Sequence, residues 1–381
     1  MSQDSGSTSP RSSAGSAGSA GSAATRPRGS GGVLSERYDT ALLDLDGVVY
    51  TGGDAVPHAV DALAAARKAG MRLAYVTNNA LRPPEAVAGH LTELGVPAEA
   101  EDVITSAQAV ARLIAERLPE GAKVLVVGGE GLRLALRERG LTPVDRADDE
   151  PVAVAQGYGG PDMVWRRFWE ASAAINRGAL WFASNTDLTI PSPLGIVPGN
   201  GAAVEVVRIA TGAEPEVAGK PLPPMHRETI LRTGARRPLV VGDRLDTDIE
   251  GAFRGEVDSL LVLTGVTDAR QLLAAEPRHR PTYVDADLRG LLSAQPDVTG
   301  VTDATDATHA TAAQDADGGD GFACGGWTAS VRGGALVIDR AGEGDGDPVD
   351  GLRALCAAAW TQAGDGSCGL DAGKALGRLG W

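Results

Sequence analysis

The sequence predicts an α/β protein whose core is a doubly wound parallel sheet. Two observations support this prediction. From residue 40 onward, short apolar runs alternate with helical stretches, which is the pattern of parallel βα units. The runs are continuously apolar, as expected for strands that helices cover on both faces. The chain has 381 residues, enough for two to three domains of about 150 residues each.

Seven apolar runs are expected as strands, and they include residues 40–46, 72–79, 122–129, 152–158, 180–185, 238–243 and 259–264. Before them, residues 1–32 form a Ser/Gly/Ala-rich segment without the apolar stretch of a signal peptide, so we expect a disordered leader. After residue 295 the apolar periodicity stops, which indicates a flexible linker. Beyond it, residues 327–340 predict two strands around Gly333-Gly334, and residues 348–364 an amphipathic helix.

Charge and composition restrict the class of partner. The net charge is −15, but residues 297–350 hold eleven Asp/Glu against two arginines, so the acidity is mostly local. Without a basic surplus we expect no nucleic-acid partner. No run approaches the length of a membrane span, about 18 apolar residues, so we expect no membrane partner. The three cysteines match no metal-binding spacing, and a reduced cytoplasm is the simplest setting.

Two acidic residues end the first run, in Asp44-Leu45-Asp46-Gly47. Carboxylates two positions apart lie on the same side of a continuing strand, and Gly47 indicates a turn that brings both toward one site. Taken alone, an Asp at this position also suits the cap of the next helix.

Two further motifs offer groups that suit phosphate. Thr77-Asn78-Asn79 follows the second run, and its hydroxyl and backbone N–H groups can hold phosphate oxygens, although such a run also caps helices. Lys220 is one of four lysines in the chain, and a cation at the sheet edge would neutralise phosphate. An ordinary surface lysine is the alternative.

The fourth motif spans residues 242–248, with the sequence GDRLDTD, and again follows an apolar run. A cluster of acids at one sheet edge repels itself unless a cation is bound, and hard divalent cations prefer oxygen ligands. The motif therefore predicts a Mg²⁺ site with Asp243 as the first ligand, or otherwise a solvated acidic loop.

In this order, each at the end of a strand, the four motifs resemble those of the haloacid dehalogenase superfamily of phosphohydrolases. The insert between the second and third motifs contains LWFASNTD and PGNG, and it resembles the large α/β cap of the nitrophenyl phosphatase and glycerol 3-phosphate phosphatase subfamily. The similarity spans roughly residues 38–293. Residues 80–82 depart from the family pattern, because Ala80 stands where a small hydroxyl residue is usual.

The resemblance implies a role for each acid. Asp44 would be the nucleophile that forms an aspartyl phosphate, and Asp46 the general acid and base. Mg²⁺ would be held by Asp44, the backbone carbonyl of Asp46 and Asp243, with Asp248 in an outer shell.

It also implies groups that contact the substrate. Thr77, Asn78 and Lys220 would hold the phosphoryl oxygens. Three polar residues of the cap are candidates for recognising the leaving group, although each also suits a turn: Asn185, Asp187 and Asn200.

The resemblance completes the expected architecture as a doubly wound parallel-sheet core with an inserted α/β cap domain and a small C-terminal α+β module. The expected boundaries are a leader at 1–32, a core at 33–108 and 212–295, a cap at 109–211, a linker at 296–321 and a module at 322–381. The module resembles a truncated acetyltransferase. We expect no acetyl transfer, because Glu343 and Asp365 stand where the pyrophosphate-binding turn of that family needs glycine.

The implied function is Mg²⁺-dependent hydrolysis of a small phosphate monoester. Glycerol 3-phosphate is the favoured substrate, because glycerol phosphate phosphatases combine a capped core with a short C-terminal extension. Phosphoglycolate, a nucleoside monophosphate and a sugar phosphate remain open, as does a catalytically silent phosphate-binding regulator. For the C-terminal module we expect packing on the core or self-association through its apolar residues Trp327, Leu336, Leu352, Leu355 and Trp360, so a homo-oligomer is left open.

Overall fold

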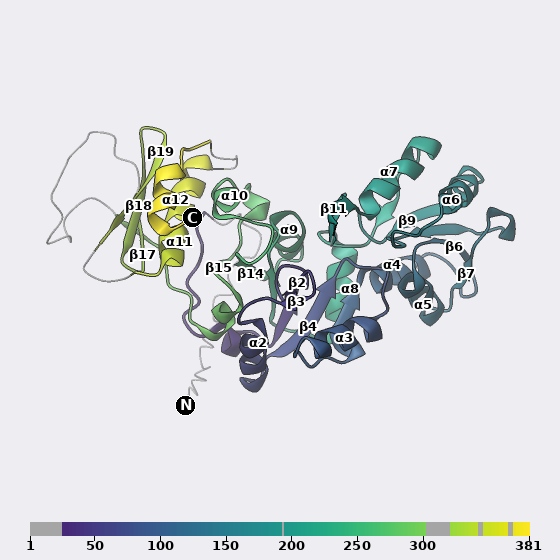
Figure 1. The fold of residues 1–381 in the computed structure, drawn as a ribbon, viewed down its shortest axis with the longest axis horizontal. Coiled ribbons are helices and arrows are strands. Elements are labelled where there is room, and N and C mark those ends of the chain that lie inside the picture. Colours follow the sequence, from purple (N-terminus) through teal and green to yellow (C-terminus); the bar gives the residue numbers. More distant parts are fainter. Residues whose placement is uncertain (1–24, 193, 302–320, 342–345, 365–368) are drawn as a thin grey trace, which may run out of the picture.

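The computed structural model describes residues 25–192, 194–301, 321–341, 346–364 and 369–381. The described chain is elongated and has three parts (Figure 1). A central core lies between an inserted domain, built from β6 to β12, and a C-terminal module, built from β16 to α12. The α/β fold class with a parallel-sheet core is confirmed.

The core sheet has six parallel strands in the order β15-β14-β13-β1-β4-β5. Their bounds are β1 Thr40–Leu43, β4 Arg72–Thr77, β5 Val103–Thr105, β13 Pro238–Gly242, β14 Asp258–Val262 and β15 Tyr283–Asp285. β1 lies between β4 and β13, so the order of strands along the chain reverses at β1. Ligands of doubly wound sheets bind at this reversal, outside the carboxyl ends of the strands.

Successive residues of the core strands point to opposite faces of the sheet, and the residues on both faces are apolar. Helices therefore cover both faces. One face packs on α2 and α3, and the other on α4, α8, α9 and α10. The bounds are α1 Leu34–Arg37, α2 Ala59–Lys68, α3 Pro84–Glu93, α4 Ser106–Ala115, α8 Pro223–Thr233, α9 Glu250–Arg254 and α10 Ala269–Leu273. A short hairpin of β2 (Tyr50–Thr51) and β3 (Asp54–Ala55) follows β1.

The inserted domain has its own parallel sheet in the order β12-β9-β8-β6-β7. The bounds are β6 Lys123–Val127, β7 Thr142–Val144, β8 Ala153–Gln156, β9 Leu180–Ala183 and β12 Glu216–Val217, with α5 Glu130–Glu138, α6 Arg166–Asn176 and α7 Asn200–Thr211. An antiparallel hairpin, β10 (Thr189–Ser192) and β11 (Gly195–Pro198), precedes α7. α4 packs against α5 of this domain as well as α8 of the core, so one apolar cluster joins the two parts.

The C-terminal module is an antiparallel sheet covered by helices. Its strands are β16 Thr299–Val301, β17 Gly321–Cys324, β18 Trp327–Arg332 and β19 Ala335–Arg340, and its helices are α11 Pro348–Ala363 and α12 Gly373–Leu379. The expected amphipathic helix is present as α11, but it is buried on all sides from Gly351 to Trp360. It exposes no polar face over these residues because it lies between its own sheet and the core.

All seven expected strands are present, as is the Gly333-Gly334 turn. Three boundaries differ from those expected. β12 pairs with β9, so the inserted domain extends beyond its expected end at residue 211. β16 pairs with β17, so the C-terminal module includes residues of the expected linker. Ser30 N donates to Gln295 O at 3.0 Å, so the core includes residues of the expected leader. These pairings join segments far apart in the sequence, so local composition does not reveal them. Residues 1–24 and most of the expected linker lie outside the described chain.

Short helical segments complete the core and the inserted domain: the 3-10 helices Ala100–Asp102, Ala147–Asp149, Pro277–His279 and Leu288–Leu292, and the π-helix Leu245–Ile249. Within the described ranges, no helix has the length and apolar character needed to cross a bilayer.

Candidate active site

The ends of three adjacent core strands bring the predicted site residues together. Asp44 directly follows β1, Thr77 ends β4, and Asp243 directly follows β13. The chain turns at Gly47, where φ is +83°, as its position after the two acids predicts. A Cβ at this position would lie 2.6 Å from Asp243 Oδ2, so the approach of the two segments requires glycine.

Three carboxylates form a compact cluster. Asp44, Asp243 and Asp248 each place an oxygen within 4.8 Å of the others. Asp243 is 0% exposed and Asp248 1%. Burial, then Asp248 and Asp44, raise the pKa of Asp243 to about 7, and burial raises the pKa of Asp248 to about 6. Carboxylates crowded in this way are costly to ionise unless a cation joins them.

One oxygen of the cluster has no partner. Asp243 Oδ2 accepts a hydrogen bond from Val266 N at 2.7 Å. Asp243 Oδ1 is buried and has no hydrogen-bond partner among the described residues. An unpaired buried carboxylate oxygen beside two further carboxylates suits a hard divalent cation, which takes oxygen ligands. Asp44 and Asp243 are therefore the side chains that would hold such a cation.

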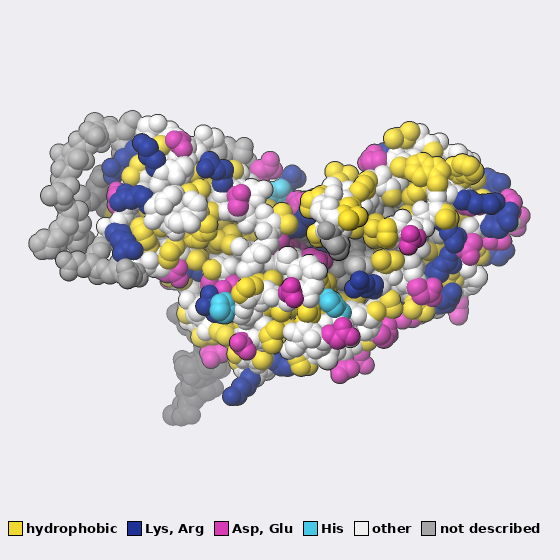
Figure 2. Space-filling model, in the orientation of Figure 1, with side chains coloured by type: hydrophobic (Ala, Val, Ile, Leu, Met, Phe, Trp, Pro, Cys, Tyr) yellow, Lys and Arg dark blue, Asp and Glu magenta, His cyan; other side chains and the backbone are white. Residues whose placement is uncertain are grey.

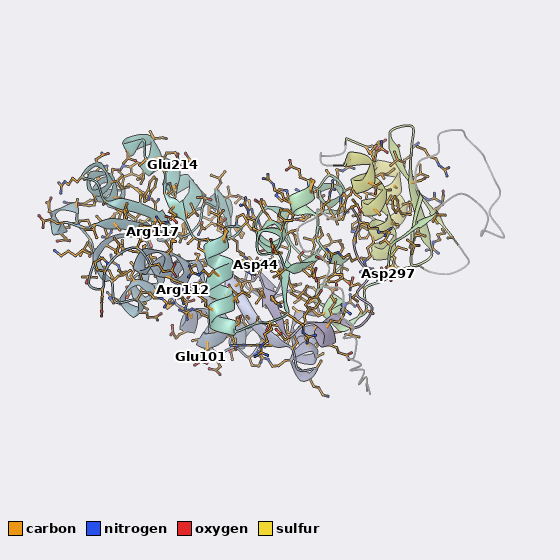
Figure 3. All side chains as sticks on the ribbon, turned by 180° about the vertical axis from the view of Figure 1, so that it is seen from behind. Asp44, Glu101, Arg112, Arg117, Glu214 and Asp297 are labelled. Atoms are coloured by element: carbon orange, nitrogen blue, oxygen red, sulfur yellow. The ribbon has the colours of Figure 1, made fainter. Side chains whose placement is uncertain are left out.

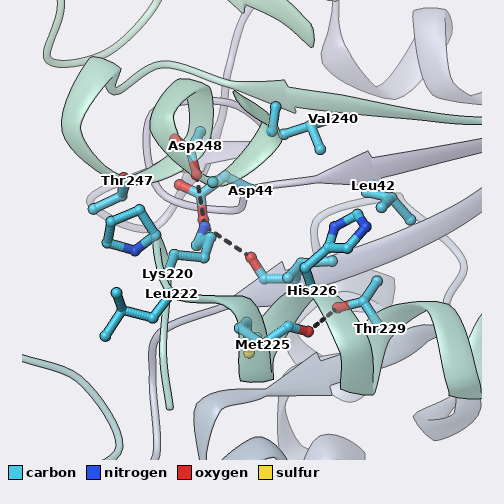
Figure 4. A pocket seen from close by; sticks show the side chains of 14 residues that line it. Leu42, Asp44, Lys220, Leu222, Met225, His226, Thr229, Val240, Thr247 and Asp248 are labelled. Atoms are coloured by element: carbon cyan, nitrogen blue, oxygen red, sulfur yellow. Dashed lines mark hydrogen bonds and ion pairs between the residues drawn. The ribbon is translucent and has the colours of Figure 1, made fainter. Parts of the chain in front are cut away.

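Lys220 lies between two acids of this cluster. Its Nζ donates to Asp44 Oδ1 at 2.5 Å, to Asp248 Oδ1 at 2.8 Å and to Val76 O at 3.1 Å (Figure 4). Burial alone would lower the pKa of Lys220, but Asp248 and Asp44 raise it above its ordinary value. Lys220 is therefore a fixed positive charge beside Asp44, and Asp248 holds it there.

A small cavity of about 40 Å³ lies beside Lys220, lined in part by Met225 and His226 of α8 (Figure 4). It accommodates at most a few water molecules, so it is too small for a phosphate ester. A substrate must therefore approach Asp44 from another side.

Asp46 lies outside the carboxylate cluster. Its side chain is exposed at the turn after β1, close to Tyr50 of the β2–β3 hairpin. The surrounding protein still desolvates the carboxylate enough to raise its pKa, against the opposing effects of Lys220 and Arg82. A carboxyl group with a raised pKa and access to solvent suits proton transfer near neutral pH.

The two residues expected to bind phosphate from β4 differ in their surroundings. Thr77 is buried, and its Oγ1 accepts from Asn79 N at 3.1 Å. The side-chain amide of Asn78 is already bonded to protein groups: Oδ1 accepts from Lys220 N at 2.8 Å, and Nδ2 donates to Asp187 and to Lys220 O. The structure therefore shows the Asn78 side chain joining the Lys220 segment to the inserted domain.

The three polar residues expected in the cap lie at the base of the inserted domain. Asn185 Nδ2 donates to Asn78 O at 2.7 Å, and Asp187 accepts from Asn78 Nδ2 at 3.1 Å. Asn200 is 1% exposed and donates to Asn185 O at 2.7 Å. Asn185 and Asp187 thus contact the core, whereas Asn200 lies beneath them and supports their loop.

The segment after β14 also belongs to the site, and it lies outside the four sequence motifs. Val266 N bonds Asp243, Thr267 N donates to Asp243 O at 3.1 Å, and Thr264 Oγ1 donates to Gly47 O at 2.6 Å. The signal was present in the sequence, because Thr264-Gly265 follows an apolar run just as three of the four motifs do.

Three family models match the chain. The model described as haloacid dehalogenase-like hydrolase matches residues 41–142, and a second hydrolase model of the same superfamily matches residues 217–291. The GCN5-related N-acetyltransferase like domain matches residues 324–381, in agreement with the resemblance of the C-terminal module.

Individual relatives cover most of the chain. D-glycerol 3-phosphate phosphatase of Mycobacterium tuberculosis is 42% identical over 86% of this chain and 87% of its own length. Acid sugar phosphatase of Staphylococcus haemolyticus is 35% identical over 68% of this chain and 97% of its own. The solved glycerol phosphate phosphatase of M. tuberculosis in complex with magnesium has a TM-score of 0.74 at 42% identity, covering 86% of this chain and 92% of that one.

Proposed function

Because the chain belongs to the haloacid dehalogenase-like hydrolases, we propose that it is a Mg²⁺-dependent phosphatase that hydrolyses a small phosphate monoester, with glycerol 3-phosphate as the favoured substrate. The observation that carries this proposal is the buried cluster of Asp44, Asp243 and Asp248 with Lys220 at the ends of the central strands. The unpaired Asp243 Oδ1 supports a cation there.

In the proposed reaction Asp44 is the nucleophile. Its carboxylate attacks phosphorus, a bond forms between carboxylate oxygen and phosphorus, and the ester P–O bond breaks. Asp46 gives a proton to the departing alkoxide, which leaves as an alcohol. Asp46 then takes a proton from water as that water attacks the aspartyl phosphate, releasing inorganic phosphate and restoring Asp44.

The other groups stabilise charge and fix geometry. Lys220 neutralises charge on the phosphoryl oxygens beside Asp44, and the Thr77 hydroxyl lies at the same strand end. Asp44, the Asp46 carbonyl and Asp243 would hold Mg²⁺, which neutralises further phosphoryl charge when it is bound. Asp248 is assigned to holding Lys220, through the ion pair at 2.8 Å.

We assign the inserted domain the role of a cap over this site. It is joined to the core at the site itself through Asn185, Asp187 and Asn78. Figure 2 shows hydrophobic side chains gathered on the inserted domain near α7 and β11. Leu188, Leu194 and Ile196 in and beside the β10–β11 hairpin are exposed. A domain in this place excludes water and selects the leaving group.

The substrate assignment rests on similarity that extends through the C-terminal module. The D-glycerol 3-phosphate phosphatase matches 86% of the chain, whereas the acid sugar phosphatases and a Bacillus subtilis 5'-nucleotidase match 65% to 68%. Those shorter relatives make sugar phosphates and nucleoside monophosphates the second candidates.

A substrate panel at fixed Mg²⁺ tests the proposal. The panel contains glycerol 3-phosphate, phosphoglycolate, a sugar phosphate and a nucleoside monophosphate, and phosphate release gives kcat/KM for each. We expect glycerol 3-phosphate to have the highest kcat/KM. A higher value for another ester would reassign the substrate, and no turnover of any ester would support a silent phosphate-binding regulator.

We further propose a cytoplasmic location, supported by the free, buried thiols of Cys324 and Cys356. The C-terminal module is proposed to have no acetyltransferase activity, and Glu343 and Asp365, on which that expectation rests, lie outside the described residues.

Self-association through Trp327, Leu352 and Trp360 is not supported, because these side chains are buried in the module and against the core. An oligomer would have to use another surface, such as exposed Trp165 and Trp169 of α6.

A further inference from the structure

The loop Leu263–Asp268, called here the β14–α10 loop, holds the metal-site carboxylate in place. Val266 N donates to Asp243 Oδ2 at 2.7 Å, which leaves Oδ1 unpaired. Thr267 N donates to Asp243 O at 3.1 Å. A Cβ on Gly265 would lie 2.0 Å from Asp243 Oδ2, so the loop backbone packs directly on the carboxylate. The loop has neither helix nor strand structure, so its position depends on the elements that flank it.

One flank of the loop is fastened to the C-terminal module through α10. α10 begins directly after the loop, with Asp268 as its N-cap. Leu272 of α10 is fully buried in the same apolar cluster as α11, and its carbonyl accepts from Trp360 Nε1 at 3.2 Å. Arg280 lies over the Trp360 ring at 5.7 Å and donates to Gly364 O at 2.9 Å. Trp360 therefore fixes α10, and α10 fixes the end of the loop.

The other flank is fastened through β15. Leu263 N donates to Asp285 O and Ala286 O, each at 3.2 Å. The end of β15 is in turn held by Arg353 of α11, which is 4% exposed. Arg353 Nη2 donates to Val284 O at 2.5 Å and to Asp285 Oδ2 at 3.2 Å. A buried guanidinium on a strand carbonyl is a rigid contact, because its donors are planar and have no water to replace the partner.

We propose that the C-terminal module is a brace for the metal site, and that Trp360 and Arg353 are positioning residues that set the affinity of Asp243 for its cation through the β14–α10 loop. The identity of the cation as Mg²⁺ rests on the proposed function. The two contacts approach the loop from opposite ends, so loss of either one lets the Val266 N–H move relative to Asp243. Residues that orient a metal ligand contribute to metal affinity without touching the metal.

The test measures Mg²⁺ binding directly, by titration calorimetry on the full chain without substrate. Trp360→Phe keeps the apolar packing and removes the Nε1 donor. Arg353→Lys keeps the charge and removes the planar pair of donors. Val87→Ala on α3, a buried residue of the opposite face of the core sheet, is the matched control for lost stability. Thermal melts of all four proteins report the stability change.

For Trp360→Phe and Arg353→Lys we expect the Mg²⁺ dissociation constant to rise about threefold to tenfold, less than the 10- to 100-fold that is typical when a direct partner of a metal ligand is lost. We expect kcat at saturating Mg²⁺ to remain near the native value, and Val87→Ala to lower the Tm without changing the dissociation constant.

Native Mg²⁺ affinity in both interface variants, with Tm values lowered as in Val87→Ala, would overturn the brace. Phosphatase activity of the native chain is measured separately. Weakened Mg²⁺ binding in the variants of a chain that hydrolyses no phosphate ester would support the brace and overturn the proposed function. A native chain that binds no Mg²⁺ would overturn both.

Discussion

Single residues in the site are arranged so that one lysine balances two of three crowded acids. In Figure 3 Asp44 lies near the middle of the molecule, where the core meets the inserted domain. Lys220 bonds both Asp44 and Asp248, while the hydrogen-bond partner of Asp243 is the backbone N–H of Val266. The site therefore has an excess of negative charge in a buried place, and this excess leads to two predictions.

Asp44→Asn is expected to abolish phosphate release and leave the fold intact. The amide cannot attack phosphorus, whereas Lys220 keeps its ion pair with Asp248 and its bond to Val76 O. Removing one of three crowded carboxylates also relieves repulsion, so the Tm should stay the same or rise. Phosphate release and a thermal melt check this. Near-native turnover by a folded Asp44→Asn protein would refute the nucleophile assignment.

Asp243→Asn is expected to make the metal-free protein less sensitive to pH. The pKa of Asp243 is raised to about 7 in the folded chain. Its contribution to stability is therefore complete below its unfolded pKa, near 4, and is lost as the pH rises through 7. One unit of pKa shift corresponds to about 1.4 kcal/mol. A side-chain amide at this position does not ionise, so this loss disappears in the variant, while the loss from Asp248 remains.

The measurement is the Tm in EDTA at pH 5 and pH 8. We expect the native chain to lose more stability than Asp243→Asn between these values, and Mg²⁺ at pH 8 to raise the Tm of the native chain much more than that of the variant. Equal pH dependence of the Tm in the two proteins would show that ionisation of Asp243 does not destabilise the native chain.

Among the elements, α8 carries much of the connection between core and inserted domain. Its Glu228 is 0% exposed and is bonded by Arg112 of α4, Arg139 at the end of α5 and Arg232 of α8 itself. Figure 3 shows Arg112 beside α8. Burial alone would raise the pKa of Glu228, but Arg112 and Arg232 hold it below its ordinary value. One carboxylate thus joins helices of two domains.

Glu228→Gln is expected to cost about 2 kcal/mol of stability near pH 7, less than the 3 to 5 kcal/mol of a fully buried pair because the arginines stay partly hydrated. The depressed pKa means that the Glu228 contribution is present above its unfolded pKa, near 4.3, and is lost as the pH falls through the folded pKa. The variant should therefore approach native stability at low pH. Urea unfolding at pH 7 and pH 3 measures both effects.

The matched control is Glu216→Gln. Glu216 of the inserted domain bonds Arg117, which follows α4 of the core, but Arg117 is exposed and Glu216 is only partly buried, unlike Glu228. A surface pair of this kind contributes about 0 to 1 kcal/mol, so little change is expected. An equal cost for the two variants would show that the burial of Glu228 does not matter.

In the whole molecule, the C-terminal module and the core share one apolar cluster. Leu261 and Leu272 of the core pack in the same cluster as Leu352, Leu355 and Trp360 of α11. The pattern of contacts is that of a single interior and not of two domains meeting at a polar surface. A cooperative unit of this kind opens as a whole.

Hydrogen exchange on the full chain is expected to show this cooperativity. Amides of α11, residues 348–363, should exchange with nearly the same free energy of opening as those of β13 and β14, because the helix opens only when the core face does. Mass spectrometry of peptic fragments measures both segments in one experiment. Much faster exchange in α11 than in β14 would mean that the module opens independently.

The sequence by itself determined the strands and the motifs that follow them. Continuous apolar runs identify buried parallel strands wherever they occur, and the carboxyl ends of such strands meet at one edge. For this reason Asp44 and Asp243 could be assigned to one site without coordinates, and the structure places them in the same cluster. Lys220 follows none of these runs and was assigned through the family resemblance, and in the structure it contacts Asp44 directly. These are properties of local pattern and chain order.

Only the tertiary structure decided which partners those residues have. The sequence predicts Asn78 as a phosphate ligand, and the structure adds that its side-chain amide bonds residues that lie 109 and 142 positions away. It predicts an amphipathic helix at 348–364, yet the core covers the remaining face of that helix. The bond from Val266 to Asp243 and the burial of Glu228 by three arginines arise in the same way. Burial and hydrogen bonding depend on segments that meet only when the chain folds, so the local sequence around a residue does not predict its partners.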